Sequence, residues 1–376
     1  MRHLPGHLPG HPPGHLPGYL PGQSHRAAKL SIDLSALQHN FKQVKKFSAS
    51  RKIMPVIKAN AYGHGLLRVA DALTDADGFA VAQIAEAIAL REHGIEKPLS
   101  VFQGFLNASQ LDLIYQYDLR PAISQQWQID LLEKKQSATA IDVWLKNNTG
   151  MGRLGFQLDD VDRAYQQLKL NPAISRIGLM MHFANADEPA HPSNQLQIQH
   201  FSNLTASYKN NPKTDSSAAN SAAIISGLLT NEDWVRPGIM LYGSSPFADK
   251  NAVDLHLKPV MSLRAQLIAI NEMEKGQTVG YGDAWLCPEN MLVGIVNIGY
   301  GDGYPRHAVG APVAVNGQRC KLIGRVSMDS IAVDLRGIKT RCGDVVECWG
   351  QQISVDEVAA SAQTIGYELL CNAGRN

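Results

Sequence analysis

The sequence predicts an α/β protein: a (β/α)8 barrel of the TIM type followed by a smaller all-β domain. The first observation is that short apolar segments alternate with amphipathic segments of helical period from Lys29 to about Pro259. Strand–helix units that repeat every ~20–40 residues are typical of a parallel sheet. The second observation is a change of pattern after about His256, where β-rich runs are separated by glycine-containing turns.

The predicted strands of the first region are short apolar runs bounded by turn residues. They are Ile53–Ile57, Gly78–Val81, Leu99–Phe102, Arg120–Ile123, Ile141–Leu145 and Ile177–Met181. The predicted helices between them are Ala82–His93, Ala108–Tyr117, Gln125–Lys134, Leu158–Leu168 and Asn194–Tyr208. Eight such units would close a barrel. A doubly wound open sheet is the alternative, which is disfavoured because no Gly-x-Gly-x-x-Gly segment follows the first strand.

The last part of the chain predicts a domain of roughly 120 residues built from strands. Its predicted strands are Pro259–Ile270, Val293–Ile298, Ala311–Val315, Lys321–Val326, Ser330–Val333 and Asp344–Cys348. We therefore expect the barrel over residues 28–257 and the β domain over residues 258–376.

Residues 1–27 differ in composition from the rest of the chain. The tetrapeptide His-Leu-Pro-Gly at residues 3–6 recurs with slight variation through Gly22. A segment so rich in proline and glycine forms neither a helix nor a strand ladder, so we predict a disordered low-complexity tail. Its histidines at positions 3, 7, 11 and 15 could bind a metal weakly, but a passive tail is the favoured interpretation.

Composition excludes several classes of function. The net charge of +1 gives no reason to expect nucleic acid or an anionic membrane as a partner. No apolar run is long enough to span a bilayer. The five cysteines are odd in number and contain no Cys-x-x-Cys pair, which disfavours a disulfide framework and a zinc ribbon. We therefore expect reduced thiols, a cytoplasmic location and no metal site.

Lys58 is the most informative single residue. It follows the apolar strand Ile53–Ile57 and precedes a turn that contains Gly63 and Gly65. Desolvating an ammonium group at a strand end is costly, and a Schiff base with a carbonyl cofactor would remove that cost. The alternative is a lysine that reaches out to solvent.

Several other polar residues also follow apolar runs. In a barrel, side chains placed directly after strands converge on the C-terminal face, where the chemistry of this fold takes place. The residues with this placement are Lys58, Arg153, His182, Asn220 and Arg236. The sequence therefore predicts one polar site at the barrel mouth.

Eight segments in order resemble the bacterial alanine racemases, which use pyridoxal 5'-phosphate (PLP). They are Pro55–Gly65, Lys146–Gly155, Met181–Asp187, Asn220–Ala222, Arg236–Gly243, Val279–Asp283, Ile298–Arg306 and Gly324–Asp329. The resemblance covers nearly everything after residue 28 and implies a (β/α)8 barrel with a β domain. It also implies interconversion of L-alanine and D-alanine, through a Schiff base of the amino acid with PLP (external aldimine), to supply D-alanine for peptidoglycan.

The resemblance assigns two catalytic bases on opposite faces of the substrate. Lys58 holds PLP at rest and is the base for the D-enantiomer, and Tyr281 is the base for the L-enantiomer. His182 neighbours Tyr281, and Arg236 lies beyond it at the ring nitrogen of the cofactor. An arginine cannot accept a proton there, which limits transamination as a side reaction.

Further roles follow from the same resemblance. The remaining cofactor-binding residues that it implies are Tyr62, Asn220, Ser221, Gly238, Ile239 and Tyr242. The implied substrate-binding residues are Arg153, Met328, Asp329 and Tyr300. Lys146 occupies the position that some members carbamylate, and the unmodified lysine is an equally good interpretation. A homodimer with shared active sites is the implied assembly.

The chain departs from the family pattern in two places. Asn148 stands where the family often has aspartate, so the charge near Arg153 differs. A phosphate-binding tyrosine that some members have near the C-terminus has no counterpart by position, because Tyr367 lies several residues too early.

Three other functions remain as alternatives. A racemase of wider specificity would act on serine, lysine or arginine, although Tyr300 and Tyr304 favour a small pocket. A PLP decarboxylase of the same barrel class is disfavoured by Arg236. A non-catalytic PLP carrier would lack the second domain and its Tyr281.

Overall fold

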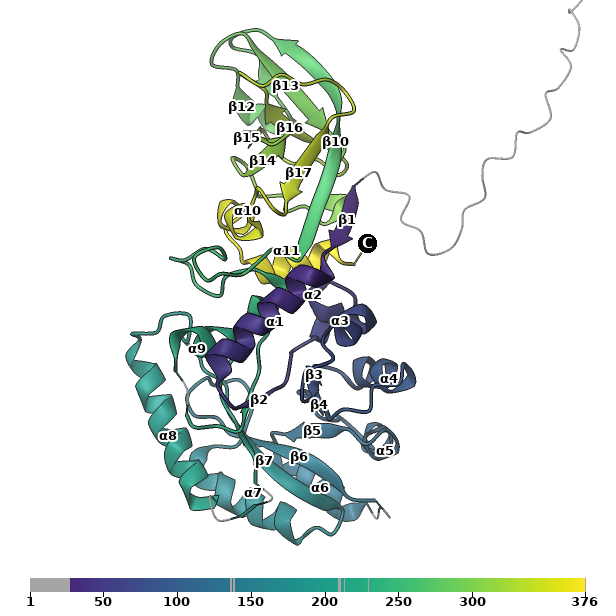
Figure 1. Ribbon diagram of the computed structural model, residues 1–376, viewed down its shortest axis with the longest axis vertical. Helices are drawn as coiled ribbons and strands as arrows, with labels where there is room; N and C mark the ends of the chain where they lie inside the picture. The colour runs from purple at the N-terminus through teal and green to yellow at the C-terminus, as the bar shows by residue number, and fades with distance from the viewer. Residues whose placement is uncertain are drawn as a thin grey trace, which may run out of the picture.

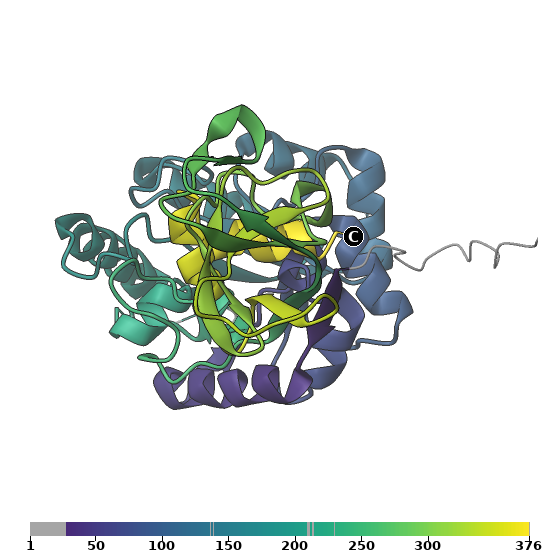
Figure 2. The same cartoon turned by 90° about the horizontal axis from the view of Figure 1, so that it is seen from above.

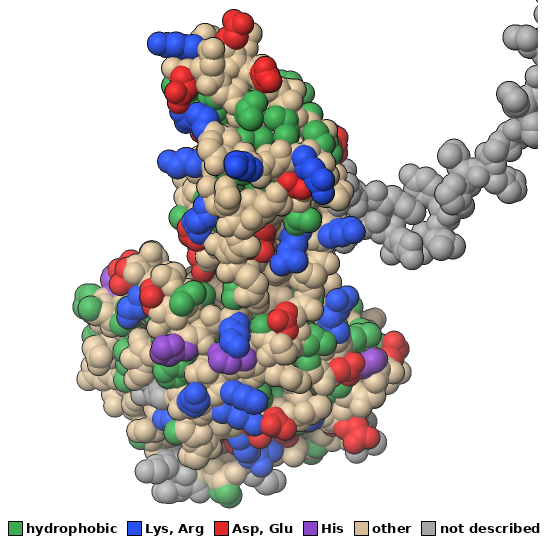
Figure 3. Space-filling view, turned by 45° about the horizontal axis from the view of Figure 1, so that its top comes forward, with side chains coloured by type: hydrophobic (Ala, Val, Ile, Leu, Met, Phe, Trp, Pro, Cys, Tyr) green, Lys and Arg blue, Asp and Glu red, His purple; other side chains and the backbone are tan. Residues whose placement is uncertain are grey.

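A computed structural model of the chain describes residues 28–375, except 136, 138, 209, 210, 213 and 229. The predicted tail at residues 1–27 lies outside the described residues. The molecule has two lobes, a barrel and a β domain that stands on the barrel's mouth (Figures 1 and 2). On the face seen in Figure 3, basic and acidic side chains are interspersed over both lobes. Among the described helices, none is long and apolar enough to cross a membrane.

The first lobe contains a parallel eight-stranded sheet, which confirms the predicted barrel. In sheet order its strands are β2 (Lys52–Ile53), β9 (Trp234–Val235), β8 (Ser216–Ser217), β7 (Ile174–Met180), β6 (Ile141–Lys146), β5 (Arg120–Ile123), β4 (Leu99–Val101) and β3 (Phe79–Val81). A parallel bridge between Val56, just after β2, and Ala80 of β3 closes the ring. The sequence did not predict β8 and β9, because two-residue strands carry too short an apolar run to detect.

Helices surround the barrel on its outer side (Figure 1). They are α1 (Leu34–Ser48), α3 (Leu66–Ala72), α4 (Ile84–Glu92), α5 (Ala108–Gln116), α6 (Gln126–Lys134), α7 (Leu158–Leu170), α8 (Pro192–Tyr208) and α9 (Ser221–Ser226). Two shorter segments, α2 (Lys58–Tyr62) and the 3-10 turn η1 (Ile239–Tyr242), lie at the barrel mouth instead. Their apolar residues recur at helical spacing. In α7, for example, Val161, Ala164, Tyr165 and Leu168 are buried against the sheet.

The second lobe is an antiparallel sheet. In sheet order its strands are β1 (Lys29–Ile32), β10 (Met261–Met273), β13 (Met291–Val296), β16 (Ile331–Asp334), β15 (Gln318–Ile323), β14 (Pro312–Val315) and β17 (Val345–Trp349). Because β10 also pairs with β17, the sheet curls and closes on itself. Its loops hold the hairpin β11 (Thr278–Val279) and β12 (Trp285–Leu286) and the 3-10 turns η2 (Tyr281–Asp283) and η3 (Tyr300–Asp302).

Two features of this lobe differ from the predicted organisation. The first strand, β1, pairs with β10 from Lys29 opposite Arg264 to Ile32 opposite Met261, so it belongs to the C-terminal sheet and not to the barrel. Pairing covers what would otherwise be an open edge of β10. The lobe also ends in two helices that the sequence did not predict, α10 (Val355–Ser361) and α11 (Gly366–Ala373). Helix α11 contacts α2 at the barrel mouth.

Candidate active site

A cavity of about 580 Å³ opens at the C-terminal ends of the barrel strands. Its wall includes most of the barrel residues that the sequence singled out: Lys58, Tyr62, Lys146, Arg153, His182, Asn220, Ser221, Arg236, Gly238 and Ile239. The convergence expected from their positions after apolar runs is therefore present in the fold.

Lys58 enters this cavity from an unusual turn. The four residues that follow it, Ala59–Tyr62, all have φ between 52° and 54°, so the segment labelled α2 is a left-handed turn. Such a conformation costs about 1–2 kcal/mol for each L-residue. The imidazole Nδ1 of buried His64 holds the turn from inside, at 3.0 Å from the carbonyl oxygen of Ala61 and 2.9 Å from that of Tyr62.

The environment of Lys58 favours its neutral amine. Burial lowers the pKa of Lys58, the positive charge of Arg153 lowers it further, and Cys371 and Glu86 oppose these effects. A lysine needs the unprotonated form to act as a nucleophile or a base.

Arg236 is fixed by neutral acceptors. Its Nη1 donates to the hydroxyl of Ser217 at 2.5 Å, and its Nη2 donates to the carbonyl oxygens of Met181 at 2.7 Å and Ala218 at 3.0 Å. Within the described part of the chain its Nε makes no hydrogen bond. Burial lowers the pKa of Arg236 to about 10, against the opposing charge of Glu232, so the guanidinium remains a cation with a donor to spare.

The contact between Arg236 and His182 sets the tautomer of the histidine. His182 Nδ1 lies 3.2 Å from Arg236 Nη2. A guanidinium can only donate, so Nδ1 accepts and the ring proton is on Nε2. Burial, followed by the charge of Arg236, holds the pKa of His182 well below its ordinary value. The imidazole is therefore neutral and has an N–H to offer.

Four basic side chains line the cavity: Lys58, Lys146, Arg153 and Arg236. No aspartate or glutamate is among the described residues of its wall. Burial, followed by the charges of Arg236 and Arg153, lowers the pKa of Lys146 to about 8. An excess of basic groups around a cavity indicates that the ligand supplies the negative charge.

One side of the cavity is a cradle of backbone and hydroxyl groups. A Cβ atom on Gly238 would lie 2.8 Å from Tyr62 Oη, so only glycine leaves the space open. Gly238 N–H donates to Ser221 Oγ at 2.8 Å. Ser221 and Ile239 are the first residues of α9 and η1, so two helical turns begin here, and N–H groups at such ends favour anions. Behind the cradle, Tyr242 stacks on Tyr62 with ring centroids 4.8 Å apart.

The predicted residues of the β domain do not line this cavity. Tyr281, Met328 and Tyr300 are exposed, with 67%, 52% and 39% of their surface accessible. The Met328–Asp329 loop lies against η3, because the carbonyl oxygen of Met328 accepts the N–H of Gly301 at 2.9 Å. A single chain therefore brings together the barrel residues and leaves this second group on an open surface.

The sequence missed part of the cavity wall. Tyr367 and Cys371 of α11 line it, and the Tyr367 ring centroid is 6.0 Å from that of Tyr62. Tyr367, which lies several residues too early in the chain to be assigned the phosphate-binding role by position, is thus a wall residue of the cavity. The local pattern carries no signal for it. What brings α11 to the mouth is a close backbone approach, since a Cβ on Gly63 would overlap the carbonyl oxygen of Leu370.

Comparison with known proteins gives one consistent result. Residues 32–246 match the family model "Alanine racemase, N-terminal domain", and residues 260–376 match "Alanine racemase, C-terminal domain". An alanine racemase from Nitrosococcus oceani is 47% identical over 90% of this chain and 95% of its own length. The crystal structure of biosynthetic alanine racemase from Pseudomonas aeruginosa is similar with a TM-score of 0.88 and 42% identity, over 93% of this chain and 97% of that one. The alanine racemase structure from Acinetobacter baumannii gives a TM-score of 0.87 at 43% identity, over 92% and 97%. The chain belongs to the alanine racemase family.

Proposed function

We propose that this protein is an alanine racemase that interconverts L-alanine and D-alanine with PLP as its cofactor. The observation that carries the proposal is the cavity at the barrel mouth, where Lys58 stands among cations without a carboxylate in the described wall. PLP and an amino acid together bring a phosphate and a carboxylate to such a site. The product D-alanine would serve peptidoglycan synthesis. We place the enzyme in the cytoplasm, which agrees with five free cysteines.

The residues present fit the phosphate and the ring nitrogen of PLP. The cradle of Gly238, Ser221 and Ile239 would hold the phosphate, with Tyr62 beside it. Asn220 caps α9 by accepting the N–H of Ala223 at 3.0 Å and so fixes one side of that cradle. Tyr242 supports Tyr62 from behind and donates to the carbonyl oxygen of Val56.

Arg236 would hold the ring nitrogen of the cofactor. The partnerless Nε of Arg236 is the donor available for that nitrogen, and a guanidinium does not give up its proton to it at neutral pH. When bound, PLP delocalises the electron pair left at the α-carbon after its proton is removed. By leaving that nitrogen unprotonated, Arg236 would favour prompt return of the proton to the α-carbon.

Two bases would exchange the α-proton. Lys58 removes it from D-alanine, and Tyr281 removes it from L-alanine on the opposite face. A tyrosine in water loses its proton only near pH 10. The Nε2–H of neutral His182, held in that tautomer by Arg236, would donate to the oxygen of Tyr281 and stabilise its phenolate.

Substrate binding would use Arg153, Tyr300 of η3 and the loop that carries Met328 and Asp329. The planar fork of an arginine matches the two oxygens of a carboxylate. Carbamylation of Lys146 would add a negative charge near Arg153 and orient it. Only the neutral amine reacts with carbon dioxide, and a pKa of about 8 leaves a fraction of Lys146 neutral at pH 7.

The active site would be shared between two subunits. Tyr281 and Met328 are exposed on the β domain of one chain, whereas Lys58 lies in the cavity of the barrel. A two-fold dimer that places each β domain over the other barrel mouth would complete two identical sites.

The proposed activity is tested with a panel of L-amino acids. The protein, purified with PLP, is incubated with each amino acid, and D-amino-acid oxidase reports the enantiomer formed. We expect D-alanine to form fastest, with no product from Lys58→Ala. Faster conversion of serine, lysine or arginine would indicate the wider racemase, and no conversion with PLP still bound would indicate a carrier.

The shared site is tested by mixing two inactive variants. Lys58→Ala and Tyr281→Phe each remove one base from both sites of a homodimer. A mixed dimer would collect both defects in one site and leave the other intact. Random exchange of equal amounts should therefore restore about a quarter of wild-type activity. If tagged subunits exchange and activity stays at the level of the variants, both bases come from one chain.

A further inference from the structure

The carboxylate of Glu86 joins the turn of Lys58 to the neighbouring barrel unit. Its Oε1 accepts the N–H of Ala59 at 2.6 Å. Its Oε2 accepts the N–H groups of Ala82 at 3.0 Å and Gln83 at 3.1 Å. These two residues connect β3 to α4, of which Glu86 is the third residue. One side chain therefore ties the residue after Lys58 to the start of the next helix.

The turn needs support from outside its own sequence. Ala59 and Ala61 have side chains that favour the right-handed region, yet both are left-handed. The direction of a backbone N–H depends on the backbone conformation. The bond from Ala59 N–H to Glu86 therefore fixes the peptide plane between Lys58 and Ala59, from which the left-handed turn starts.

We propose that Glu86 is a positioning residue for the reaction, which holds the left-handed turn and thereby the direction in which Lys58 enters the cavity. The inference rests on the proposed function. Glu86 is not among the residues that line the cavity, so it acts through the backbone next to Lys58 and not by touching substrate or cofactor.

A purely electrostatic role would give a different result. The charge of Glu86 raises the pKa of Lys58 against the effect of burial. Removing only that charge would make the neutral amine more available, so the acid limb of the pH–rate profile would move to lower pH with kcat maintained. Loss of positioning instead lowers kcat, because the amine no longer meets the α-proton in the right geometry.

The substitutions Glu86→Gln and Glu86→Ala test the proposal. Glutamine keeps the size of the side chain but replaces one oxygen by an NH2 group, which cannot accept a hydrogen bond. At least one of the N–H groups of Ala59, Ala82 and Gln83 therefore loses its acceptor. Glu92→Gln on the same helix is the matched control, since among the described residues Glu92 accepts a hydrogen bond only from the hydroxyl of Tyr117, at 3.2 Å. All are prepared as the PLP-loaded enzyme.

The first measurement is hydrogen exchange followed by mass spectrometry. Exchange in the peptide that covers residues 58–65 should be about tenfold faster in both Glu86 variants, because the bond from Ala59 N–H is weakened or lost. Peptides from the β domain and the Glu92→Gln control should exchange as in the wild type.

The second measurement separates the two bases. Alanine deuterated at the α-carbon is used in both directions, and kcat is expected to fall by about 10–100-fold with little change in KM. If the Lys58 step has become slower, the deuterium isotope effect rises for D-alanine, from which Lys58 takes the proton. It falls for L-alanine, from which Tyr281 takes it.

The outcomes distinguish this inference from the proposed function. If the wild type racemises alanine but both Glu86 variants keep the wild-type exchange rates and isotope effects, Glu86 does not position Lys58. Isotope effects that change equally in both directions would indicate general loss of structure and overturn the inference as well. If the wild type does not racemise alanine, the proposed function fails first and the inference falls with it.

Discussion

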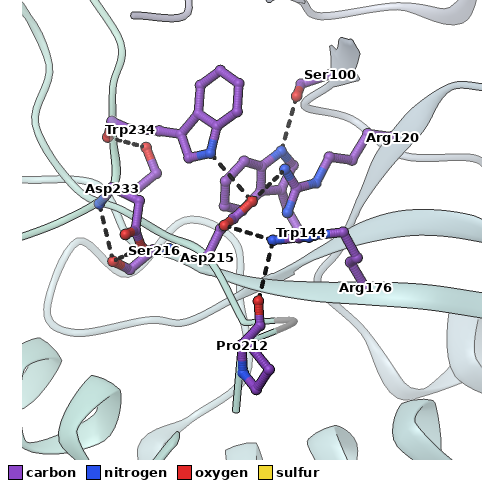
Figure 4. A network of polar contacts seen from close by, with 10 residues as sticks. Ser100, Arg120, Trp144, Arg176, Pro212, Asp215, Ser216, Asp233 and Trp234 are labelled. Atoms are coloured by element: carbon purple, nitrogen blue, oxygen red, sulfur yellow. Dashed lines mark hydrogen bonds and ion pairs between the residues drawn. The ribbon is translucent and has the colours of Figure 1, made fainter. Parts of the chain in front are cut away.

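The two ends of the barrel hold buried arginines in opposite situations. Arg236 at the mouth and Arg120 at the N-terminal end, the floor, are 3% and 6% exposed. Burial is the main cause that lowers the pKa of each to about 10. Arg236 contacts carbonyl oxygens, a serine and a histidine, whereas Arg120 pairs with the carboxylate of Asp215 at 3.3 Å (Figure 4).

The floor pairs its charges within the protein, although Nε and Nη2 of Arg120 have no hydrogen-bond partner among the described residues. Asp215 also pairs with Arg176 at 3.0 Å and accepts the indole N–H of Trp234 at 3.2 Å. The guanidinium of Arg120 lies 3.5 Å from the ring centroid of Trp144. Burial alone would raise the pKa of Asp215, but the two arginines outweigh it and hold that pKa below its ordinary value.

The difference shows which end of the barrel has charged side chains that are available to a ligand. At the floor, cations meet a carboxylate and aromatic rings, so their removal should cost stability. At the mouth, four basic side chains face a cavity whose described wall contains no carboxylate. Their positive charge destabilises the cofactor-free protein and favours the binding of an anion. Substitutions at the mouth should therefore lower activity without lowering stability, and substitutions at the floor should lower stability without lowering the activity of the folded protein.

The largest effect is expected for Lys58→Ala at the mouth. Loss of the base and of the cofactor attachment should lower kcat by about 10⁴-fold or more. The melting temperature of the cofactor-free protein should not fall, because a costly buried amine has been removed. Borohydride treatment of the wild type followed by peptide mapping should find the cofactor on Lys58. Attachment to another lysine would contradict the assignment.

The next largest effect is expected for Asp215→Ala at the floor. Leaving Arg120 buried and unpaired should cost about 3–5 kcal/mol of unfolding free energy, measured by urea denaturation. The activity of the protein that remains folded should stay close to that of the wild type. Asp75→Ala is the control, because Asp75 pairs with Lys45 on the surface and its loss should not change stability. Equal losses of unfolding free energy in the two variants would show that the floor network contributes no more to stability than a surface ion pair.

Whether the sequence predicted each end depended on how far apart along the chain the interacting residues lie. The mouth was predictable because Lys58, His182 and Arg236 each follow an apolar run, and strand ends converge in a barrel. The floor was not, because Arg120 is the first residue of an apolar strand and its partner Asp215 is 95 residues away. Tyr367 was missed for the same reason, since only the folding of α11 onto α2 brings it to the cavity.

A smaller effect of opposite sign is expected for Lys146→Met at the mouth. The ordinary lysine pKa is 10.5, and in the folded protein it is about 8. Between these values the unfolded chain binds more protons, so stability of the wild type rises with pH from about 8 to about 10.5. Below pH 8 the substitution should stabilise the cofactor-free protein by about 3 kcal/mol. The gain should vanish above pH 10.5, and a gain independent of pH would point to packing as its cause.

The smallest effect is expected for Tyr367→Phe, the cavity residue that comes from the second lobe. Phenylalanine preserves the ring beside Tyr62 and removes only the hydroxyl, so the stability of the cofactor-free protein should be unchanged. If that hydroxyl donates to the cofactor phosphate, the dissociation constant of PLP should rise by about 5–10-fold, the value of one hydrogen bond. kcat at saturating PLP should stay near the wild-type level. Tyr117→Phe, which removes an exposed hydroxyl bonded to Glu92, is the matched control. Equal PLP affinities in the two variants would restrict phosphate binding to the barrel. A raised dissociation constant in Tyr367→Phe alone would mean that α11 adds a phosphate-binding hydroxyl to the groups that the barrel supplies.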